Sequence, residues 1–465
     1  DGYPVLHLKG TPYEMGYQHG ALFKDHVREN AKYLLEVKGD QEALEWGPVR
    51  VKPRALIETI IEIQKRFVPD RYLEEIRGVA EGAGLPEADA RLANFIPEMF
   101  HCSGFALMNS ATQDGTLYHG RVLDYAIDWR LQEHAVLIVA EPQGGIPFVN
   151  VTYAGFIGSV TGMNARHVSI GEMGGGGIGH WEGVPMAWLV RDALERAETL
   201  DDAVRIFRDS PRTCQYFYVI ADAKTNRAVG MEASWNAFFT IEPGQHHPLL
   251  PKPVKDTVLL SAGDRYDELA RRAQAAHGTF TAETAIRLMD RPVAAESNLH
   301  NVLFEPKSTR LWVANAGADL QPAAEREYRA FQLTELLARA LGLLGCERAW
   351  VVHGADGLDE GLQGLRARAV LSEGELGAGF HLPPQRPPGH AGELLDQLVD
   401  PVADAAGARV GLPAPADDDV LELLEQAGVV HQVIGIDAVG LEGLLHRRDP
   451  PGGIFRAVQA AVRVE

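Results

Sequence analysis

The sequence predicts a mixed α+β protein in which helices flank layers of short strands. Apolar residues recur at helical spacing through the first hundred residues, whereas short apolar and β-branched runs separated by turns begin after Cys102. Helical stretches interrupt those runs near 186–209 and 266–289, so helices are expected on both faces of the strands. The chain has 465 residues, which is more than one hydrophobic core usually contains, and at least two units are expected.

Residues 1–101 are predicted to be a helical N-terminal segment. Thr11, Pro12 and Glu14 form the pattern of a capping box, with a hydroxyl at the N-cap, proline at the first helical position and glutamate at N3. Apolar spacing predicts further helices over 56–67 and 73–79, and Pro86 is expected to open a fourth.

From residue 102 the chain changes to strand-like runs. A hairpin is expected from two runs that flank the turn signal Asp114-Gly115. The predicted strands cover 103–109, 116–123, 135–140, 148–153, 167–170, 216–221, 228–232, 258–260 and 311–314.

Charge and composition exclude several partners. Lys and Arg number 44 against 64 Asp and Glu, a net charge of −20, and such a surface repels the phosphates of nucleic acids. No apolar run reaches the roughly 18 residues that a membrane span needs, so no membrane partner is expected. Three well-separated cysteines form neither a disulfide framework nor a zinc cluster. The chain begins at Asp1 instead of Met, which suggests a removed or omitted leading segment and leaves cytoplasmic and exported locations both open.

Cys102 is the candidate nucleophile, since it stands at a helix-to-strand junction before two small residues. The alternative is a small buried core residue, which is the usual place of a free cysteine. The hairpin register bears on the choice. A two-residue loop would place Cys102 opposite Ile127, whereas a loop over 111–115 would place it opposite Asp124, with Arg121 within reach on the same strand. A surface ion pair is the alternative role of Arg121 and Asp124.

Five segments resemble the isopenicillin N acyltransferase family of self-cleaving cysteine acyltransferases and hydrolases, which belong to the N-terminal-nucleophile superfamily. They are Gly10–Gly20, His101–Leu107, Gly120–Asp124, Gly162–Asn164 and Ser297–Asn301, and the resemblance covers about residues 5–320. It implies a four-layer αββα sandwich as the core over 102–325. It also implies that Cys102 cuts the bond between His101 and itself, so that residues 1–101 and the rest become two chains that stay associated.

The resemblance also implies the roles of the site residues. Cys102 would be the nucleophile of self-cleavage and of acyl transfer, Asp124 would orient its α-amino group, and Arg121 would hold the cysteine or a substrate carboxylate. An unprotonated α-amine, with a pKa near ~8, is a suitable base for the thiol. Asn164, Asn298 and Asn301 are the candidate oxyanion or substrate ligands, and backbone amides near residues 172–174 are the alternative donors. Asn164 has a turn residue as its other interpretation, and His19, in the first helix, is expected to be packed or exposed instead of catalytic.

The last third differs in composition, because no lysine follows Lys307. Residues 326–388 form a predicted fragment that resembles part of anthranilate phosphoribosyltransferase, and 389–465 is unassigned. By that resemblance Asp359 and Glu360 are weak candidates for binding Mg²⁺. The glycine-rich pyrophosphate loop of that enzyme is absent from the chain, so a structural role is favoured for the fragment.

The resulting prediction is a self-processing cysteine hydrolase or acyltransferase that acts on a small amide or acyl-donor substrate without cofactor or metal. The alternatives are a phosphoribosyltransferase-like protein and a non-catalytic binding scaffold. The oligomeric state stays open.

Overall fold

The computed structural model describes residues 3–41, 44–46, 49–95, 102–125, 127–175, 180–342 and 350–353. Residues Tyr3–Val352 belong to one compact unit, which contains all of the described residues except His353.

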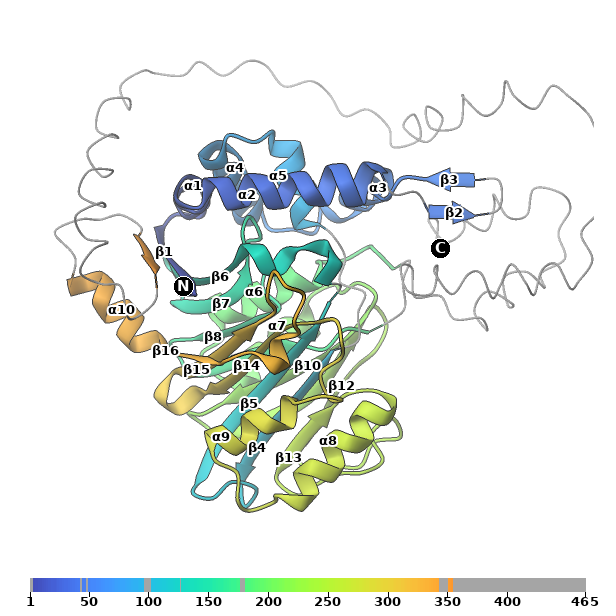
Figure 1. Cartoon of the computed structure of the whole chain (residues 1–465), viewed down its shortest axis with the longest axis vertical. Coiled ribbons are helices and arrows are strands. Elements are labelled where there is room, and N and C mark those ends of the chain that lie inside the picture. The colour runs from blue at the N-terminus through green and yellow to red at the C-terminus, as the bar shows by residue number, and fades with distance from the viewer. Residues whose placement is uncertain are drawn as a thin grey trace, which may run out of the picture. The chain divides into compact units, whose positions relative to one another are not determined.

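The N-terminal part is a layer of helices that begins with a strand (Figure 1). The capping box is present, because Thr11 and Glu14 bond each other's backbone N–H groups at the start of α1. Phe23 interrupts the helical run, and Gly84, in the left-handed region with φ +68°, ends α4. The elements are β1 (Pro4–Gly10), α1 (Pro12–Leu22), α2 (Lys24–Lys32), η1 (Tyr33–Gln41), β2 (Leu44–Trp46), β3 (Val49–Val51), α3 (Pro53–Gln64), α4 (Asp70–Ala83) and α5 (Glu87–Asn94).

The larger sheet has nine strands in the order β12-β11-β10-β9-β8-β7-β6-β1-β17. Its strands pair antiparallel from β6 to β12, whereas β1 lies parallel to β6. Their bounds are β6 (Ala135–Pro142), β7 (Phe148–Tyr153), β8 (Thr161–Asn164), β9 (Val168–Glu172), β10 (Gln215–Asp222), β11 (Arg227–Ser234), β12 (Phe238–Ile241) and β17 (Trp350–His353).

The smaller sheet has six antiparallel strands in the order β13-β4-β5-β14-β15-β16. Its first two strands in the chain are the hairpin that follows Cys102. The strands are β4 (Ser103–Asn109), β5 (Gly115–Asp124), β13 (Thr257–Leu260), β14 (Asn298–Glu305), β15 (Arg310–Asn315) and β16 (Arg329–Gln332).

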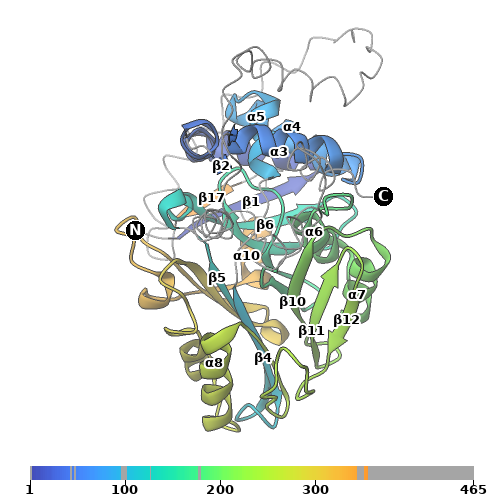
Figure 2. The ribbon, with the colours of Figure 1, turned by 90° about the vertical axis from the view of Figure 1, so that its right-hand side faces the viewer.

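The two sheets face each other and helices cover their outer faces (Figure 2). Helices α6 (Met186–Arg196) and α7 (Leu200–Asp209) pack on the nine-stranded sheet, and α8 (Gly263–Ala275) and α9 (Ala282–Ile286) pack on the six-stranded sheet. This is the αββα order of layers. The N-terminal helices share the hydrophobic core between α6, α7 and the outer face of the larger sheet.

Helices α1 and α4 approach each other through glycines. A Cβ on Gly16 or Gly20 of α1 would lie 1.9 or 2.3 Å from the backbone oxygens of Glu75 and Val79, and one on Gly78 would lie 2.2 Å from a backbone oxygen of α1. The glycines of the first helix are therefore needed for backbone-to-backbone packing.

Most predicted elements after residue 102 are present, but the N-terminal segment differs from the prediction. Residues Pro4–Gly10 form a strand of the nine-stranded sheet, so the segment is not only helical. The run is short and lies parallel to a strand far along the chain, and it therefore lacks a local hairpin signal. The predicted boundary at 325/326 falls just before β16, which pairs with β15 and continues the smaller sheet.

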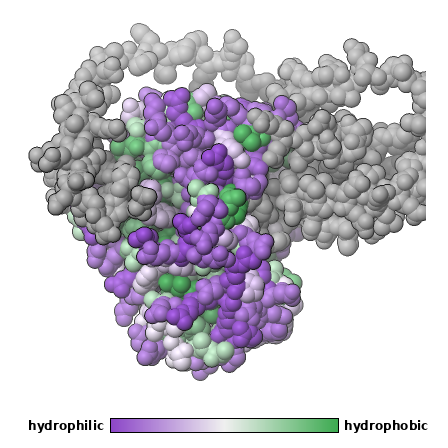
Figure 3. All heavy atoms as spheres, in the orientation of Figure 1, coloured by the Kyte–Doolittle hydropathy of each residue, from purple (hydrophilic) through white to green (hydrophobic). Residues whose placement is uncertain are grey.

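Among the described residues no helix is both long and apolar enough to cross a membrane. The described surface in Figure 3 is mostly hydrophilic, in keeping with the net charge of −20.

Candidate active site

Cys102 lies directly before β4, in the position expected of a nucleophile that becomes a chain start. It is buried, with 3% of its surface exposed, and its backbone N–H donates to the carbonyl oxygen of Met173 at 3.2 Å. This bond joins the start of the smaller sheet to the end of β9 in the larger one.

The hairpin register differs from both sequence-based alternatives. Ser103 pairs with Val122 and Gly104 with Arg121, so extending the ladder by one residue places Cys102 opposite Leu123. Neither Ile127 nor Asp124 is the partner. A register shift between Leu107 and Asn109 changes the pairing near the turn, and loop length alone therefore mispredicts it.

Asp124 and Arg121 lie on opposite faces of β5, because they are three positions apart on a strand whose side chains alternate between the two faces. Asp124 faces α8, where its carboxylate forms an ion pair with Arg265 and accepts the Ala295 N–H at 3.0 Å. The same Nη2 of Arg265 donates to Ser103 Oγ at 2.8 Å, which links Asp124 to the residue after Cys102. Burial raises the pKa of Asp124, against the opposing effect of Arg265.

Arg121 faces the larger sheet and is fully buried. Its guanidinium donates to Glu172 Oε2 at 3.4 Å, and Glu172 Oε1 accepts the N–H of Gly174. Arg121 therefore orders the segment whose Met173 carbonyl binds Cys102 N–H.

The candidate asparagines are buried and bonded within the protein. Asn298 pairs with Asp124 across the sheet, and its amide nitrogen donates to the carbonyl of Leu123 at 3.1 Å and to Asn301 Oδ1 at 2.9 Å. Asn301 in turn donates to the Tyr328 hydroxyl at 3.0 Å. The structure thus places Asn298 beside Asp124 and joins it to Asn301, but the amide N–H groups of both asparagines bond to protein groups and not to an open substrate site.

Asn164 lies away from this group. It ends β8, and the pairing of Met163 with Ser169 places it toward the opposite end of β9 from Met173. Its amide donates to Leu194 O and Ala197 O and accepts two backbone N–H groups. The Asn164 side chain therefore holds the turn after β8, although its backbone is extended and not in the left-handed conformation of the alternative interpretation.

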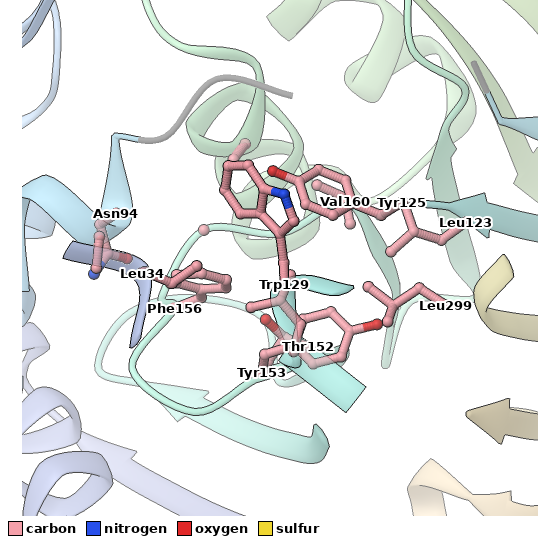
Figure 4. Close-up of a pocket in the computed structure, with 14 residues that line it drawn as sticks. Leu34, Asn94, Leu123, Tyr125, Trp129, Thr152, Tyr153, Phe156, Val160 and Leu299 are labelled. Carbon is pink, nitrogen blue, oxygen red and sulfur yellow. The ribbon is translucent and has the colours of Figure 1, made fainter. Parts of the chain in front are cut away.

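An apolar pocket is lined in part by strand residues of the smaller sheet, and Cys102 itself is not among its lining residues. Leu123, the residue opposite Cys102, lines it together with Leu299 of β14, and Figure 4 shows these two strand residues across from Leu34 and Asn94 of the N-terminal helices. The cavity volume is about 80 Å³. The full lining is Leu34, Ala93, Asn94, Leu123, Tyr125, Trp129, Leu131, Thr152, Tyr153, Phe156, Gly158, Val160, Ala187 and Leu299.

A buried histidine supports the pocket from behind. His300 bonds the hydroxyl of the lining Tyr153 through Nδ1 and that of Thr161 through Nε2, both at 2.9 Å. Burial and Arg121 lower the pKa of His300 well below its ordinary value, so the ring is neutral and donates to one hydroxyl while accepting from the other.

Several predicted sites lie outside the described residues: His101, and the weak magnesium candidates Asp359 and Glu360. Within the described ranges, no group of three or more His, Cys, Asp or Glu side chains is arranged to hold a metal ion.

Arg265 is the main site residue that the sequence did not reveal. It lies 141 residues from Asp124 on a surface-facing helix rich in arginine and acidic residues, where the sequence pattern does not distinguish it from its neighbours.

Comparisons with known proteins agree with the resemblance seen in the sequence. Residues 110–244 match the family model described as acyl-coenzyme A:6-aminopenicillanic acid acyl-transferase. Protein dcd1B of Dictyostelium discoideum is 25% identical over 72% of this chain and 75% of its own length. The N-acylethanolamine-hydrolyzing acid amidase of Mus musculus is 24% identical over 37% of this chain and 50% of its own length. The alignment thus spans about half of that relative.

Among solved structures, a Caenorhabditis elegans ortholog of this amidase overlaps 44% of the chain and 93% of its own with 18% identity and a TM-score of 0.36, which is too low to establish a shared fold. The comparisons do not support the phosphoribosyltransferase resemblance of the last third.

Proposed function

We propose that the chain is a cysteine enzyme that breaks the amide bond of an N-acyl compound, because residues 110–244 match the family model described as acyl-coenzyme A:6-aminopenicillanic acid acyl-transferase. Cys102 is the nucleophile, and water or an amine receives the acyl group. The relatives named as acid amidases support hydrolysis as the main reaction.

The observation that carries the proposal is the apolar pocket lined by Leu123, the residue that the extended hairpin register places opposite Cys102. The lining is dominated by leucine, alanine and aromatic side chains, with Thr152 and Asn94 as polar members. Such a lining favours an apolar acyl group and disfavours a charged one, because burying an unpaired charge there is costly.

Self-cleavage comes first in the proposed mechanism. The Sγ of Cys102 attacks the carbonyl carbon of His101, the C–N bond between them breaks, and the chain continues as a thioester. Water then hydrolyses the thioester, which leaves a carboxylate on His101 and a free α-amine and thiol on Cys102. The position of Cys102 directly before β4 supports this, since a new chain start there leaves every strand of the sheet intact.

Turnover then uses the new α-amine as a base. It takes the thiol proton, the thiolate attacks the substrate carbonyl, and the amine product leaves with a proton from the α-ammonium. Water repeats the attack on the acyl-enzyme and releases the acid. Asp124, held by Arg265, balances the charge of the ammonium, and Arg121 positions the Glu172–Gly174 segment through its ion pair.

The test is the intact mass of the full chain purified as wild type, Cys102→Ala and, as a matched control, Cys214→Ala. Cys214 is also buried, with 2% exposed. Two fragments that meet between His101 and Cys102 in wild type and Cys214→Ala, together with a single 50.7 kDa chain in Cys102→Ala, support the proposal. One uncut chain in all three, with no amidase activity on N-acyl compounds, would leave a non-catalytic binding scaffold instead.

A further inference from the structure

The loop after β7 forms one wall of the pocket, and its backbone is bonded by side chains of the N-terminal helices. Phe156 and Gly158 of this loop line the pocket, as does Tyr153 at the end of the strand. The loop follows the end of β7 at Tyr153 and turns at Gly155, which has φ +89°. Because the chain has left the strand, the backbone polar groups of the loop need partners other than a neighbouring strand.

Two buried side chains bind the start of the loop. His19 of α1 accepts the N–H of Gly155 at its Nε2, at 3.0 Å, and Asn30 of α2 donates to the carbonyl of Ala154 at 2.8 Å. Each of the two side chains belongs to a residue only 1% exposed. Because Nε2 of His19 accepts, the ring is neutral with its proton on Nδ1.

Asn94 of α5 binds the centre of the loop with both ends of its amide. It donates to the carbonyl of Gly155 at 2.8 Å and accepts the N–H of Ile157 at 2.9 Å. Asn94 also lines the pocket itself. Arg191 of α6 completes the set by donating to the carbonyl of Ile157 at 2.6 Å.

Three of these four side chains come from residues before Cys102, on three different helices. They bond four backbone groups of the loop, namely Ala154 O, Gly155 N–H, Gly155 O and Ile157 N–H. Buried backbone groups without a partner cost free energy, so the loop keeps this conformation only while the helices are present.

We propose that His19, Asn30 and Asn94 are positioning residues of the acyl pocket, which act by holding the backbone of the loop that forms one of its walls. The inference rests on the proposed function, in which this pocket takes the acyl group. It assigns these three residues a role in selecting the acyl chain, with no part in bond breaking.

The test measures binding of dodecanoate, a product-like acid that is not turned over, to the full chain by titration calorimetry. The variants are His19→Leu, His19→Gln and Asn94→Ala, with Gln18→Ala as the matched control. Gln18 is the neighbour of His19 on α1, and its side chain bonds the backbone N–H and carbonyl of Lys9 at 2.9 and 2.8 Å. Gln at position 19 can present an acceptor oxygen near the place of Nε2, so it should rescue the loop.

Binding about tenfold weaker in His19→Leu and in Asn94→Ala, with His19→Gln and Gln18→Ala within about threefold of wild type, is the expected result. The kinetic counterpart is a raised KM for a dodecanoyl amide with kcat nearly unchanged, and little change for an acetyl amide, a split that general loss of structure would not give. Far-UV circular dichroism identifies any variant that fails to fold. If His19→Leu does not fold, the comparison of Asn94→Ala with wild type tests the proposal by itself.

Two results would overturn the proposal in distinguishable ways. If wild type and the folded loop variants bind dodecanoate with equal, measurable affinity, the positioning role is wrong but the assignment of the acyl pocket stands. Wild type that binds no dodecanoate removes the pocket assignment of the proposed function, and the positioning role with it.

Discussion

Arg265 of α8 and Asp124 form an ion pair at the C-terminal end of β5, an interior strand of the six-stranded sheet, although the two residues are 141 positions apart in the chain. The Asp124 side chain is 3% exposed and that of Arg265 is 22% exposed. The guanidinium also donates to Ser103 Oγ and to the carbonyl of Val293, both at 2.8 Å. One side chain therefore joins the residue after the candidate nucleophile, the candidate charge-balancing carboxylate and the segment before β14.

Replacing Arg265 by alanine is expected to destabilise the fold and to abolish self-cleavage. It leaves the buried carboxylate of Asp124 without its cation, which costs about 3 kcal/mol or more. Urea unfolding measures the loss of stability, and intact mass measures cleavage. Arg271→Ala on the same helix is the control, since its pair with Glu268 is at the surface; an equal effect of both substitutions would contradict the special position of Arg265.

Alanine at Gly78 or Gly20 is expected to destabilise the N-terminal layer, although alanine normally favours a helix. The new Cβ would lie 2.2 or 2.3 Å from a backbone oxygen of the facing helix, so α1 and α4 must separate. A loss of about 2 kcal/mol in the free energy of unfolding is expected. Glu74→Ala, which removes only a surface pair on α4, should stay within about 0.5 kcal/mol of wild type.

Iodoacetamide is expected to label Cys102 faster than Cys214 in the cleaved protein, by about tenfold or more. Both residues are buried, but only Cys102 would have an α-amine next to its thiol to raise the thiolate fraction. Peptide mass spectrometry follows each site, and amidase activity should fall in step with the label on Cys102. Equal labelling rates would argue that Cys102 is an ordinary core thiol.

His19 is expected to make the fold less stable in acid. Burial lowers its pKa to about 4, whereas the unfolded value is about 6.5. Between these values the unfolded chain binds a proton that the folded chain does not, so this contribution is complete above about pH 6.5 and is lost as the pH falls toward 4.

The difference in unfolding free energy between wild type and His19→Gln isolates this effect, because the other titrating groups largely cancel. It should be constant above pH 7 and shrink by as much as about 3 kcal/mol on going down to pH 4. Urea unfolding at a series of pH values measures it. A difference that does not vary with pH would show that His19 is not buried as a neutral ring.

Val160, on the pocket wall, is expected to control the length of the acyl chain. Val160→Phe should raise the KM for long N-acyl chains about tenfold and leave acetyl amides nearly unchanged, because the added ring fills the pocket. Val160→Ala should leave room for longer chains. Steady-state kinetics over a series of acyl lengths compares the two; the same change in KM for every length would place the acyl group elsewhere.

Local patterns predicted much of the fold. The capping box at Thr11, the strand Ser103–Asn109 and the strand Phe148–Tyr153 are where the residues placed them, because capping groups and period-two runs act through near neighbours in the chain. The strand at Pro4–Gly10 was missed, since its partner Ala135–Pro142 lies far along the sequence.

The sequence by itself determined the candidate nucleophile, the carboxylate and the arginine that follow it, and the family to which they point, since these depend on residue type and short spacing. Only the tertiary structure decided which groups meet. The shift between Leu107 and Asn109 changed the hairpin register, and sheet packing brought Arg121 to Glu172. Folding also brought Arg265 to Asp124, and helix packing brought His19 to Gly155. Such contacts join segments that are distant in sequence, and their geometry is set by the packing of the whole core, which no local pattern encodes.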